Sequence, residues 1–327
     1  MLKILVTGGC GYIGSHVTRQ LSEKGFDVIV YDNLSTGSAK ALIYEERLVV
    51  GDLADEITLD KVFATNKFDA VFHFAASIVV PDSVNNPLMY YENNTINTIK
   101  LLKACIKHQV NKFIFSSTAA VYGQNKQTIV TEDLVLNPEN PYAASKAMNE
   151  RIISDVAKIT DLKFVILRYF NVAGADPLYR MGQRTPNATH LIKVACEAAL
   201  KKRDKLYIFG DKYNTPDGTC VRDYIHIEDL AEAHLRSLDY LMKGGKSDTF
   251  NCGYGKGLSV NEIIKWVKQI SKVDFITEIA PPRAGDIPMI VASNYKIKEA
   301  MKWEPQYDDI ECIVKSALEW EKKLVKL

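Results

Sequence analysis

Three glycines near the amino terminus constrain the fold of this chain more than any other feature. Gly8, Gly11 and Gly14 lie in a segment, TGGCGYIG, that follows the apolar run at residues 4–6 and precedes a helical pattern. Glycine is needed where a backbone turns tightly and approaches a pyrophosphate, and the following helix offers free N–H groups and a positive dipole end. A glycine triplet can also be a plain structural turn. Its position between a strand and a helix favours a dinucleotide-binding loop.

The first half of the chain alternates short β-branched or aromatic runs with longer amphipathic stretches. This alternation is typical of βαβ units and a mostly parallel sheet. We therefore predict an α/β fold with a Rossmann-like, doubly wound parallel sheet. The predicted strands are at residues 3–6, 28–31, 48–50, 70–74, 112–115 and 163–167. Helical periodicity is clearest at residues 14–24, 87–108 and 142–160.

The texture of the sequence changes after Asn171. Residues 176–189 contain prolines and polar residues with little periodicity, so we place a boundary just before them. We predict a cofactor-binding domain at residues 1–171 and a smaller α+β substrate domain at residues 172–327. Segment 224–253 is expected to return to the first domain. Its helix is predicted at residues 227–242 and its strand at residues 249–252.

Composition excludes several classes of protein. The 41 Lys and Arg residues nearly balance the 40 Asp and Glu residues, and no long run of like charge suggests a nucleic-acid or membrane-surface partner. The six cysteines contain no C-x-x-C pair, which argues against a zinc site and a secreted disulfide framework. No segment has the pattern of a signal peptide or the length of a membrane span. We therefore expect a cytoplasmic protein without a metal, and any anionic ligand must be held by a local site.

Asp32 indicates which dinucleotide the loop binds. It ends the second predicted strand, 18 residues after Gly14. A carboxylate there accepts hydrogen bonds from both hydroxyls of an adenosine ribose and repels a 2′-phosphate. No arginine occurs at residues 33–37. We therefore predict NAD as the cofactor; the alternative is an ordinary loop aspartate.

Two more strand ends lie beside the switch point of the predicted sheet. The third strand leads into Asp52 and Leu53, and the fourth ends with Phe74, Ala75 and Ala76. The carboxyl ends of strands at this point are where the adenine and nicotinamide halves of a dinucleotide bind. The small alanines let a cofactor approach the backbone. The histidine just before them, His73, is expected to pack within the strand rather than to act in catalysis.

Tyr142 and Lys146 form a Y-x-x-x-K pattern at the start of a predicted helix. Spacing of four residues places both side chains on one helix face. A tyrosine with an ordinary pKa near ~10 is a poor base at neutral pH. Positive charge from Lys146 and from an oxidised nicotinamide would lower that pKa, so that the phenolate could take a hydroxyl proton. Taken alone, the pattern usually means a packed tyrosine beside a solvent-facing lysine.

The hydroxyl-rich end of the fifth predicted strand favours the catalytic interpretation. Ser116, Ser117 and Thr118 lie there, at the carboxyl edge of the sheet. The Thr118 hydroxyl can hydrogen-bond to a substrate oxygen and pass protons to or from Tyr142. Both Ser117 and Thr118 can instead cap the turn that follows. We expect Ser117 to cap the turn and Thr118 to take part in the chemistry.

Motifs spread over essentially the whole chain resemble those of the UDP-glucose 4-epimerases, which are extended short-chain dehydrogenases/reductases. Together these motifs are more specific than the glycine loop, which any Rossmann enzyme can carry. They are TGGxGYIGSH at residues 7–16, DNL at 32–34, HFAA at 73–76, FSST at 115–118, YAASK at 142–146, RYFN at 168–171, GTCVRDYIH at 218–226 and RAGD at 283–286.

The resemblance implies a tightly held NAD that is regenerated within each turnover of a UDP-hexose. Tyr142 would remove the proton of the sugar C4 hydroxyl, Thr118 would assist it, and Lys146 would bind the nicotinamide ribose and lower the pKa of Tyr142. A 4-keto sugar would form, turn within the pocket while its UDP stays anchored, and be reduced on its other face. A homodimer is also implied, built from the helices at residues 87–108 and 142–160.

The strand ends and the resemblance together give the expected ligand contacts. Contacts to NAD are expected from Gly8, Gly11, Tyr12, Ile13, Gly14, Asp32, Asn33, Asp52, Leu53, Phe74, Ala75, Ala76, Asn94, Ser116, Tyr142, Lys146 and Tyr169. Contacts to the UDP-sugar are expected from Thr118, Tyr142, Asn171, Tyr207, Phe209, Arg222, Arg283 and Asp286. Arginine forks suit paired phosphate oxygens. Arg222 could instead pair with Asp223 at the surface, and Arg283 could be an exposed loop residue.

Other activities on the same fold are alternatives at this point. A 4,6-dehydratase has an acidic pair after its threonine, whereas Ala119 and Ala120 follow Thr118 here and can neither give nor take a proton. A non-catalytic NAD-sensing protein would not need the Tyr142–Lys146 pair or the arginines. A simple dehydrogenase would release NADH instead of retaining its cofactor.

Two positions depart from the family pattern. Many members have a lysine near the cofactor where this chain has SIVV at residues 77–80. Ile290 aligns roughly where some members place a bulky tyrosine that excludes N-acetyl sugars. We therefore hypothesise that UDP-GlcNAc and UDP-GalNAc are interconverted as well.

Overall fold

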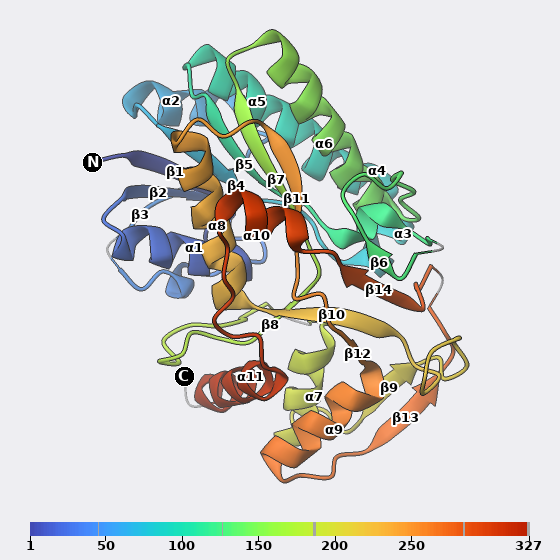
Figure 1. Ribbon diagram of the computed structural model, residues 1–327. Helices are drawn as coiled ribbons and strands as arrows, with labels where there is room; N and C mark the ends of the chain where they lie inside the picture. The colour runs from blue at the N-terminus through green and yellow to red at the C-terminus, as the bar shows by residue number, and fades with distance from the viewer. Residues whose placement is uncertain (45, 126, 186–187, 284, 326–327) are drawn as a thin grey trace.

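The computed structural model of the chain describes residues 1–44, 46–125, 127–185, 188–283 and 285–325. At its centre is a parallel sheet of seven strands in the order β11-β7-β5-β4-β1-β2-β3 (Figure 1). Strand order reverses between β1 and β4, which is the switch point where doubly wound sheets bind ligands. The strands are β1 (Lys3–Thr7), β2 (Asp27–Asp32), β3 (Arg47–Val50), β4 (Ala70–His73), β5 (Lys112–Ser116), β7 (Lys163–Tyr169) and β11 (Asp248–Cys252).

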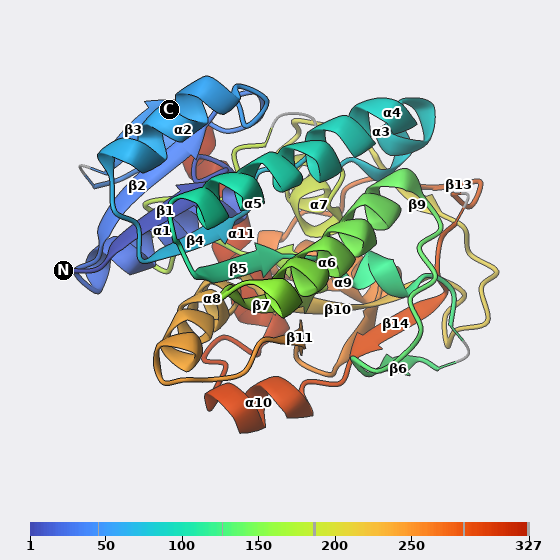
Figure 2. The same ribbon diagram turned by 90° about the horizontal axis from the view of Figure 1, so that it is seen from above.

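Alternate side chains of these strands enter two hydrophobic cores, so helices cover both faces of the sheet. Ile4 and Phe72 pack with residues of α1 and α8, whereas Leu5 and Val71 pack with residues of α2 and α5. Figure 2 shows α5 and α6 side by side on one face. No helix among the described residues is both long and apolar enough to cross a membrane. The covering helices are α1 (Tyr12–Glu23), α2 (Glu56–Thr65), α5 (Asn97–Lys107), α6 (Pro141–Ile159) and α8 (Ile227–Met242).

The predicted α/β class and doubly wound sheet are confirmed, and each predicted strand lies within two residues of its expected bounds. The helix predicted at residues 87–108 is different, because it consists of three consecutive segments. These are α4 (Pro87–Tyr90), the π-helical η2 (Tyr91–Ile96) and α5. A π-helix keeps the chain helical while shifting its hydrogen bonds by one residue, so apolar periodicity does not reveal it.

A smaller mixed part lies beside the sheet. Its β10 (Val221–His226) pairs with β8, β12 and β14, while β9 and β13 form a separate parallel pair. The smaller part also contains β8 (Asn171–Ala173), α7 (Leu191–Ala199), β9 (Leu206–Phe209), β12 (Gly257–Ser259), α9 (Val260–Ser271), β13 (Thr277–Ala280), β14 (Met289–Ala292) and α11 (Ile310–Leu324). The remaining short elements of the chain are η1 (Ala39–Ala41), α3 (Val80–Asn85), η3 (Ala119–Tyr122), β6 (Ile129–Val130) and α10 (Tyr295–Met301).

Two elements late in the sequence pack with the first sheet. Helix α8 lies beside α1, and β11 pairs with β7 along its whole length (Figure 1). The helix predicted at residues 227–242 and the strand predicted at 249–252 are therefore confirmed. A buried ion pair strengthens this contact, because the Glu228 carboxylate at the start of α8 binds Arg19 and His16 of α1.

Candidate functional site

The glycine loop between β1 and α1 is packed too tightly at Gly8 and Gly14 to accept a side chain at either position. Gly8 has φ of +71°, and a Cβ atom there would lie 2.5 Å from the backbone nitrogen of Ala75. A Cβ atom at Gly14 would lie 2.2 Å from the carbonyl oxygen of Gly8. Within the described chain, no side chain caps α1 and its first turn contains no acidic residue. Its first N–H groups are therefore available to an anion, which fits the pyrophosphate of NAD.

Asp32 and Asn33 end β2 at the carboxyl edge of the sheet. The N–H groups of Cys10 and Leu34 donate to the Asp32 carboxylate at 2.9 and 2.8 Å. These bonds fix the carboxylate while leaving lone pairs for ribose hydroxyls. Asn33 Nδ2 donates to Asp52 at 2.8 Å, so the ends of β2 and β3 lie together. This arrangement also fits NAD.

His73 lies within β4 and is engaged entirely by protein groups. Its Nδ1 lies 2.7 Å from the Thr7 hydroxyl and its Nε2 lies 2.8 Å from the Thr98 hydroxyl. Burial, together with the nearby charge of Lys146, lowers the pKa of His73 to about 3. The prediction that His73 packs within the strand is confirmed.

Tyr142 and Lys146 lie near the start of α6, against the end of β5. Both side chains are buried. The Lys146 ammonium donates to the carbonyl oxygen of Ser116 at 2.8 Å and lies 4.9 Å from the centre of the Phe115 ring. The Ser116 hydroxyl in turn lies 2.5 Å from the hydroxyl of Tyr169. Lys146 is therefore not the solvent-facing lysine that the isolated motif usually means.

Burial shifts the pKa values of both Tyr142 and Lys146. Burial raises the pKa of Tyr142 above its ordinary value, and the neighbouring Thr118 hydroxyl lowers it by less. Burial lowers the pKa of Lys146 to about 7, while the charge of Glu150 raises it. Burial therefore disfavours the charged form of both side chains. That Lys146 and an oxidised nicotinamide together lower the pKa of Tyr142 stays a prediction.

Thr118, and not Ser117 as expected, caps the turn after β5. Thr118 caps η3, because its Oγ1 accepts a hydrogen bond from the N–H of Ala120 at 3.2 Å. Ser117 does not cap; its hydroxyl donates to Glu150, which is 33 residues away in the sequence. The Thr118 cap uses a lone pair and not the hydroxyl proton, so Thr118 keeps a donor for Tyr142 or a substrate.

Asn94 lies in η2, and its side chain is committed to protein partners. Its Oδ1 accepts from the N–H of Ser77 at 2.8 Å, and its Nδ2 donates to Ser77 O and Ser145 Oγ, each at 3.0 Å. Only 1% of Asn94 is exposed. It therefore joins the segment after β4, which contains Ala75 and Ala76, to the reactive helix α6.

Arg283 and Asp286 lie in the loop before β14 and face the end of β9. The Arg283 guanidinium lies 3.7 Å from the centre of the Phe209 ring. The N–H of Asp286 donates to the carbonyl oxygen of Arg283 at 3.2 Å. Tyr207 lies on the same strand and is half exposed. Arg283 is an exposed loop residue, as the alternative had it. Its guanidinium nevertheless stacks on a ring, which holds it flat and leaves its N–H donors for an anion.

Arg222 and Asp223 do not form the surface ion pair that their adjacency allows. The Asp223 carboxylate is buried and accepts the N–H groups of Tyr254 and Gly255 at 2.9 and 2.8 Å. Arg222 is partly exposed and donates to the carbonyl oxygen of Val221 at 3.0 Å. Across the described residues, no carboxylate forms a salt bridge with Arg222. Its guanidinium is therefore available for a phosphate.

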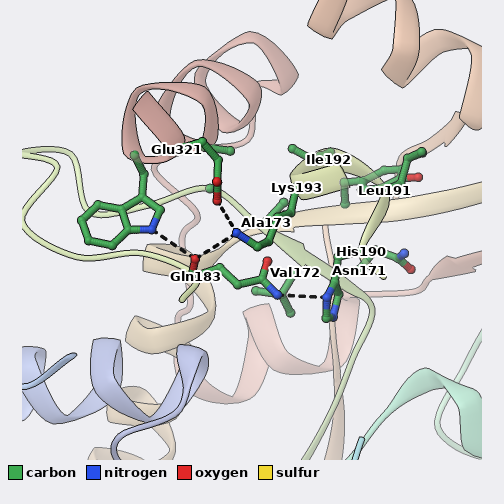
Figure 3. Close-up of a pocket in the computed structure, with 13 residues that line it drawn as sticks. Asn171, Val172, Ala173, Gln183, His190, Leu191, Ile192, Lys193 and Glu321 are labelled. Carbon is green, nitrogen blue, oxygen red and sulfur yellow. Dashed lines mark hydrogen bonds and ion pairs between the residues drawn. The ribbon is translucent and has the colours of Figure 1, made fainter. Parts of the chain in front are cut away.

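A pocket beside Asn171 adds residues that no sequence motif singled out. It is lined by β8, by the start of α7 at His190 and Leu191, and by Trp320 of α11 (Figure 3). Trp320 Nε1 donates to the carbonyl oxygen of Gln183 at 3.2 Å. No side-chain hydrogen bond caps α7 within the described chain. The helical periodicity that starts at Leu191 after a polar loop is the signal that could have located this helix end.

Ile290 lies in β14 beside Arg222 of β10. It is buried in a small hydrophobic core with Ala119, Tyr122 and Phe170. Ala119 of this core directly follows Thr118 in the sequence. In the parts of the chain that the structure describes, no three His, Cys, Asp or Glu residues gather as a metal-binding group.

Comparison with known proteins agrees with this geometry. Residues 4–253 match the family described as NAD dependent epimerase/dehydratase. A UDP-glucose 4-epimerase of Azospirillum brasilense is 50% identical over 322 residues, which cover 98% of this chain and 92% of the relative. The solved UDP-Glc/GlcNAc 4-epimerase of Campylobacter jejuni is 50% identical with a TM-score of 0.87, over 99% of this chain and 100% of that one. The UDP-glucose 4-epimerase of Bifidobacterium longum, solved with NAD+ and UDP, is 36% identical with a TM-score of 0.93, over 98% of each chain.

Proposed function

The chain belongs to the NAD dependent epimerase/dehydratase family, and from this premise we propose that it interconverts UDP-glucose and UDP-galactose by reversible epimerisation at C4. The observation that carries this proposal is the buried pair Tyr142 and Lys146 at the carboxyl edge of the sheet. The pair lies on the same edge as the glycine loop and the strand end that carries Thr118. An isomerase that retains its NAD fits this arrangement.

NAD, when bound, supplies the oxidation and the re-reduction of the sugar at C4. Tyr142 exchanges a proton with the C4 oxygen, since it is the buried phenol beside Thr118. Thr118 donates its hydroxyl proton toward Tyr142 or the sugar oxygen. Lys146 holds the end of β5 through Ser116 and, when protonated, stabilises the phenolate. The positive charge of an oxidised nicotinamide would add to this stabilisation, because burial raises the pKa of Tyr142.

The proposed cofactor site occupies the switch point of the sheet. Support comes from the tight glycine loop, the fixed Asp32 carboxylate and the buried Lys146. We assign residues 1–171 and the returning segment 224–253 to the NAD-binding domain, and the rest of residues 172–327 to the UDP-sugar-binding domain. The residues proposed to hold NAD are Gly8, Gly11, Tyr12, Ile13, Gly14, Asp32, Asn33, Asp52, Leu53, Phe74, Ala75, Ala76, Asn94, Ser116, Tyr142, Lys146 and Tyr169.

The proposed UDP site lies in the smaller part. Arg283, stacked on Phe209, and Arg222, which forms no salt bridge with any carboxylate of the described residues, supply the positive charge that a diphosphate needs. Asp286 is proposed to bind the uridine ribose and the backbone near Tyr207 the uracil edge. Asn171, with the start of α7, completes the phosphate end of this site.

N-acetylated sugars are a second class of substrate that we propose. The support is that residue 290, which packs beside Ala119 and Phe170, is an isoleucine and not the bulky tyrosine of some family members. The Campylobacter jejuni relative, named for both UDP-Glc and GlcNAc, is consistent with this proposal.

Incubation with UDP-galactose or UDP-GalNAc, without added NAD, tests these proposals. We expect UDP-glucose and UDP-GlcNAc to form with no net release of NADH, and Tyr142→Phe to lower kcat by at least ~100-fold. The products are separated by chromatography, and NADH is followed by its absorbance. Release of NADH in proportion to substrate would favour a simple dehydrogenase, whereas a 4-keto-6-deoxy product would favour a dehydratase. Robust turnover of UDP-galactose with none of UDP-GalNAc would contradict only the broader specificity.

We also propose that the enzyme is a cytoplasmic homodimer. The support for a dimer is a set of exposed apolar side chains along α4, η2 and α6, which include Leu88, Met89, Ile96 and Met148. The support for the cytoplasm is the set of six free cysteines, five of them buried, without a disulfide in the described chain.

A further inference from the structure

Helix α6 carries a buried carboxylate, Glu150, that has no role in the mechanism proposed above. Glu150 follows Lys146 by four residues and therefore lies on the same helix face. Arg168 of β7 grips its carboxylate with Nη2 at 2.6 Å and with Nε at 3.1 Å. Both side chains are nearly inaccessible to solvent, with 6% and 7% exposed. A buried pair of this kind is costly to form and costly to break.

The same carboxylate reaches the strand end that carries the proposed catalytic hydroxyl. The Ser117 hydroxyl donates to Glu150 Oε1. Ser117 lies between Ser116, whose carbonyl oxygen binds Lys146, and Thr118. Glu150 thus anchors the segment Ser116–Thr118, which binds Lys146 through the Ser116 carbonyl oxygen and carries the Thr118 hydroxyl.

The far side of the network is held by other elements, so Glu150 has little freedom to move. Arg168 Nη1 donates to the Tyr122 hydroxyl at 3.0 Å, and the guanidinium lies 5.0 Å from the centre of that ring. The Tyr122 hydroxyl donates to Asn251 Oδ1 of β11 at 2.6 Å. The network therefore joins α6, β7, η3 and β11.

Glu150 also supplies negative charge to the surroundings of Lys146, and its charge raises the pKa of that ammonium. The second charged group of the network, Arg168, is paired with Glu150. The neutral groups around the Tyr142–Lys146 turn are His73 of β4, Ser116 of β5, Asn94 and Thr95 of η2, Tyr142 of α6 and Tyr169 of β7. The elements packed against α6 also carry two carboxylates, the exposed Glu92 of η2 and the partly exposed Asp82 of α3.

We propose that Glu150 is a positioning residue for the epimerisation, which fixes the Ser116–Thr118 strand end and keeps Lys146 charged beside Tyr142. The inference rests on the proposed function. Two effects follow from it and can be separated. Loss of the Ser117 anchor lowers the rate at every pH, whereas loss of the negative charge lets Lys146 lose its proton at lower pH.

The test compares kcat and KM for UDP-galactose over the pH range in three variants of the NAD-loaded enzyme. In Glu150→Gln, the alkaline fall of kcat should move down by about one pH unit, because an adjacent opposite charge has been removed. Glu150→Asp retains the charge, so its alkaline limb should stay at the wild-type pH. In Ser117→Ala, kcat should fall severalfold without a shift of that limb. KM should change little in all three.

Asp229→Asn is the matched control for the loss of a buried carboxylate. Asp229 accepts hydrogen bonds from the Tyr254 hydroxyl and the Gln306 N–H, away from α6. This control should lower the Tm and leave the pH profile in place. An unshifted alkaline limb in Glu150→Gln, or full kcat in Ser117→Ala, would overturn the inference.

If Glu150→Gln does not fold, the kcat of Ser117→Ala decides the outcome in the same way. A wild-type enzyme that converts no UDP-hexose is a different result, because it contradicts the proposed function itself.

Discussion

At the residue scale, the ionisation of Tyr142 and Lys146 governs what the site can do. Burial moves the two pKa values apart, because it raises that of Tyr142 and lowers that of Lys146 to about 7. In both side chains burial disfavours the charged form that proton exchange requires. Charged neighbours therefore have large effects on the rate. This makes Glu150 and the charge of the bound cofactor more important than the spacing of the motif suggests.

His73 gives a stability prediction with a defined sign. Its pKa in the folded chain is about 3, against an ordinary value of 6.5, so the folded state favours the neutral ring. Its contribution is full above pH 6.5 and is lost as the pH falls toward 3. His73→Asn should be less stable than wild type at about pH 7.5. This difference in unfolding free energy should shrink by about 2 kcal/mol at about pH 5, because keeping the ring neutral at that pH destabilises the folded wild type.

Urea unfolding of both proteins at the two pH values measures this difference. A gap in unfolding free energy that is independent of pH would show that the His73 ring titrates normally in the folded chain.

At the scale of elements, the glycine loop is held by backbone contacts and tolerates no added atom at Gly14. Gly14→Ala would place a Cβ atom 2.2 Å from the carbonyl oxygen of Gly8, so the loop must shift. Loss of two hydrogen bonds to a phosphate would weaken NAD binding roughly 100-fold. The measurement is the NAD content of the purified protein and its affinity by calorimetry.

Gly25→Ala is the control for this change. Gly25 has φ of +80° and no atom within 4 Å of an added Cβ, so the substitution costs only backbone strain. The variant should lose about 1 kcal/mol of stability and keep its NAD. Equal NAD content in the two variants would contradict a tightly packed phosphate loop.

The strands, the glycine loop and the Tyr142–Lys146 face were predictable from the sequence because each depends on local spacing or on burial of both sheet faces. The network around Ser117 was not, because Glu150 and Arg168 come from distant positions and meet only after the sheet forms. The π-helical η2 is six residues long, too short for its wider turn to appear as a separate period in the sequence. The pocket at α7 depends on how that helix docks against β8. The pKa of Tyr142 depends on total burial, which no motif records.

At the scale of the whole molecule, the exposed apolar side chains of η2 and α6 predict the assembly. Ile96→Glu combined with Met148→Glu should convert a dimer into a monomer, because charges are costly to bury in an apolar interface. Light scattering after gel filtration measures the mass of each form. Ile276→Glu, on the smaller part, replaces an apolar residue that is even more exposed and should leave the dimer intact. A monomeric wild type, or a dimer in the double variant, would contradict this interface.

The proposed epimerisation removes and returns the same hydrogen at C4 of the sugar. The most direct test uses UDP-galactose that carries deuterium at C4, incubated in ordinary water and analysed by NMR after conversion. The deuterium should stay at C4 of the UDP-glucose formed. Replacement of the label by solvent hydrogen would contradict this mechanism, because epimerisation would then proceed by proton exchange at carbon.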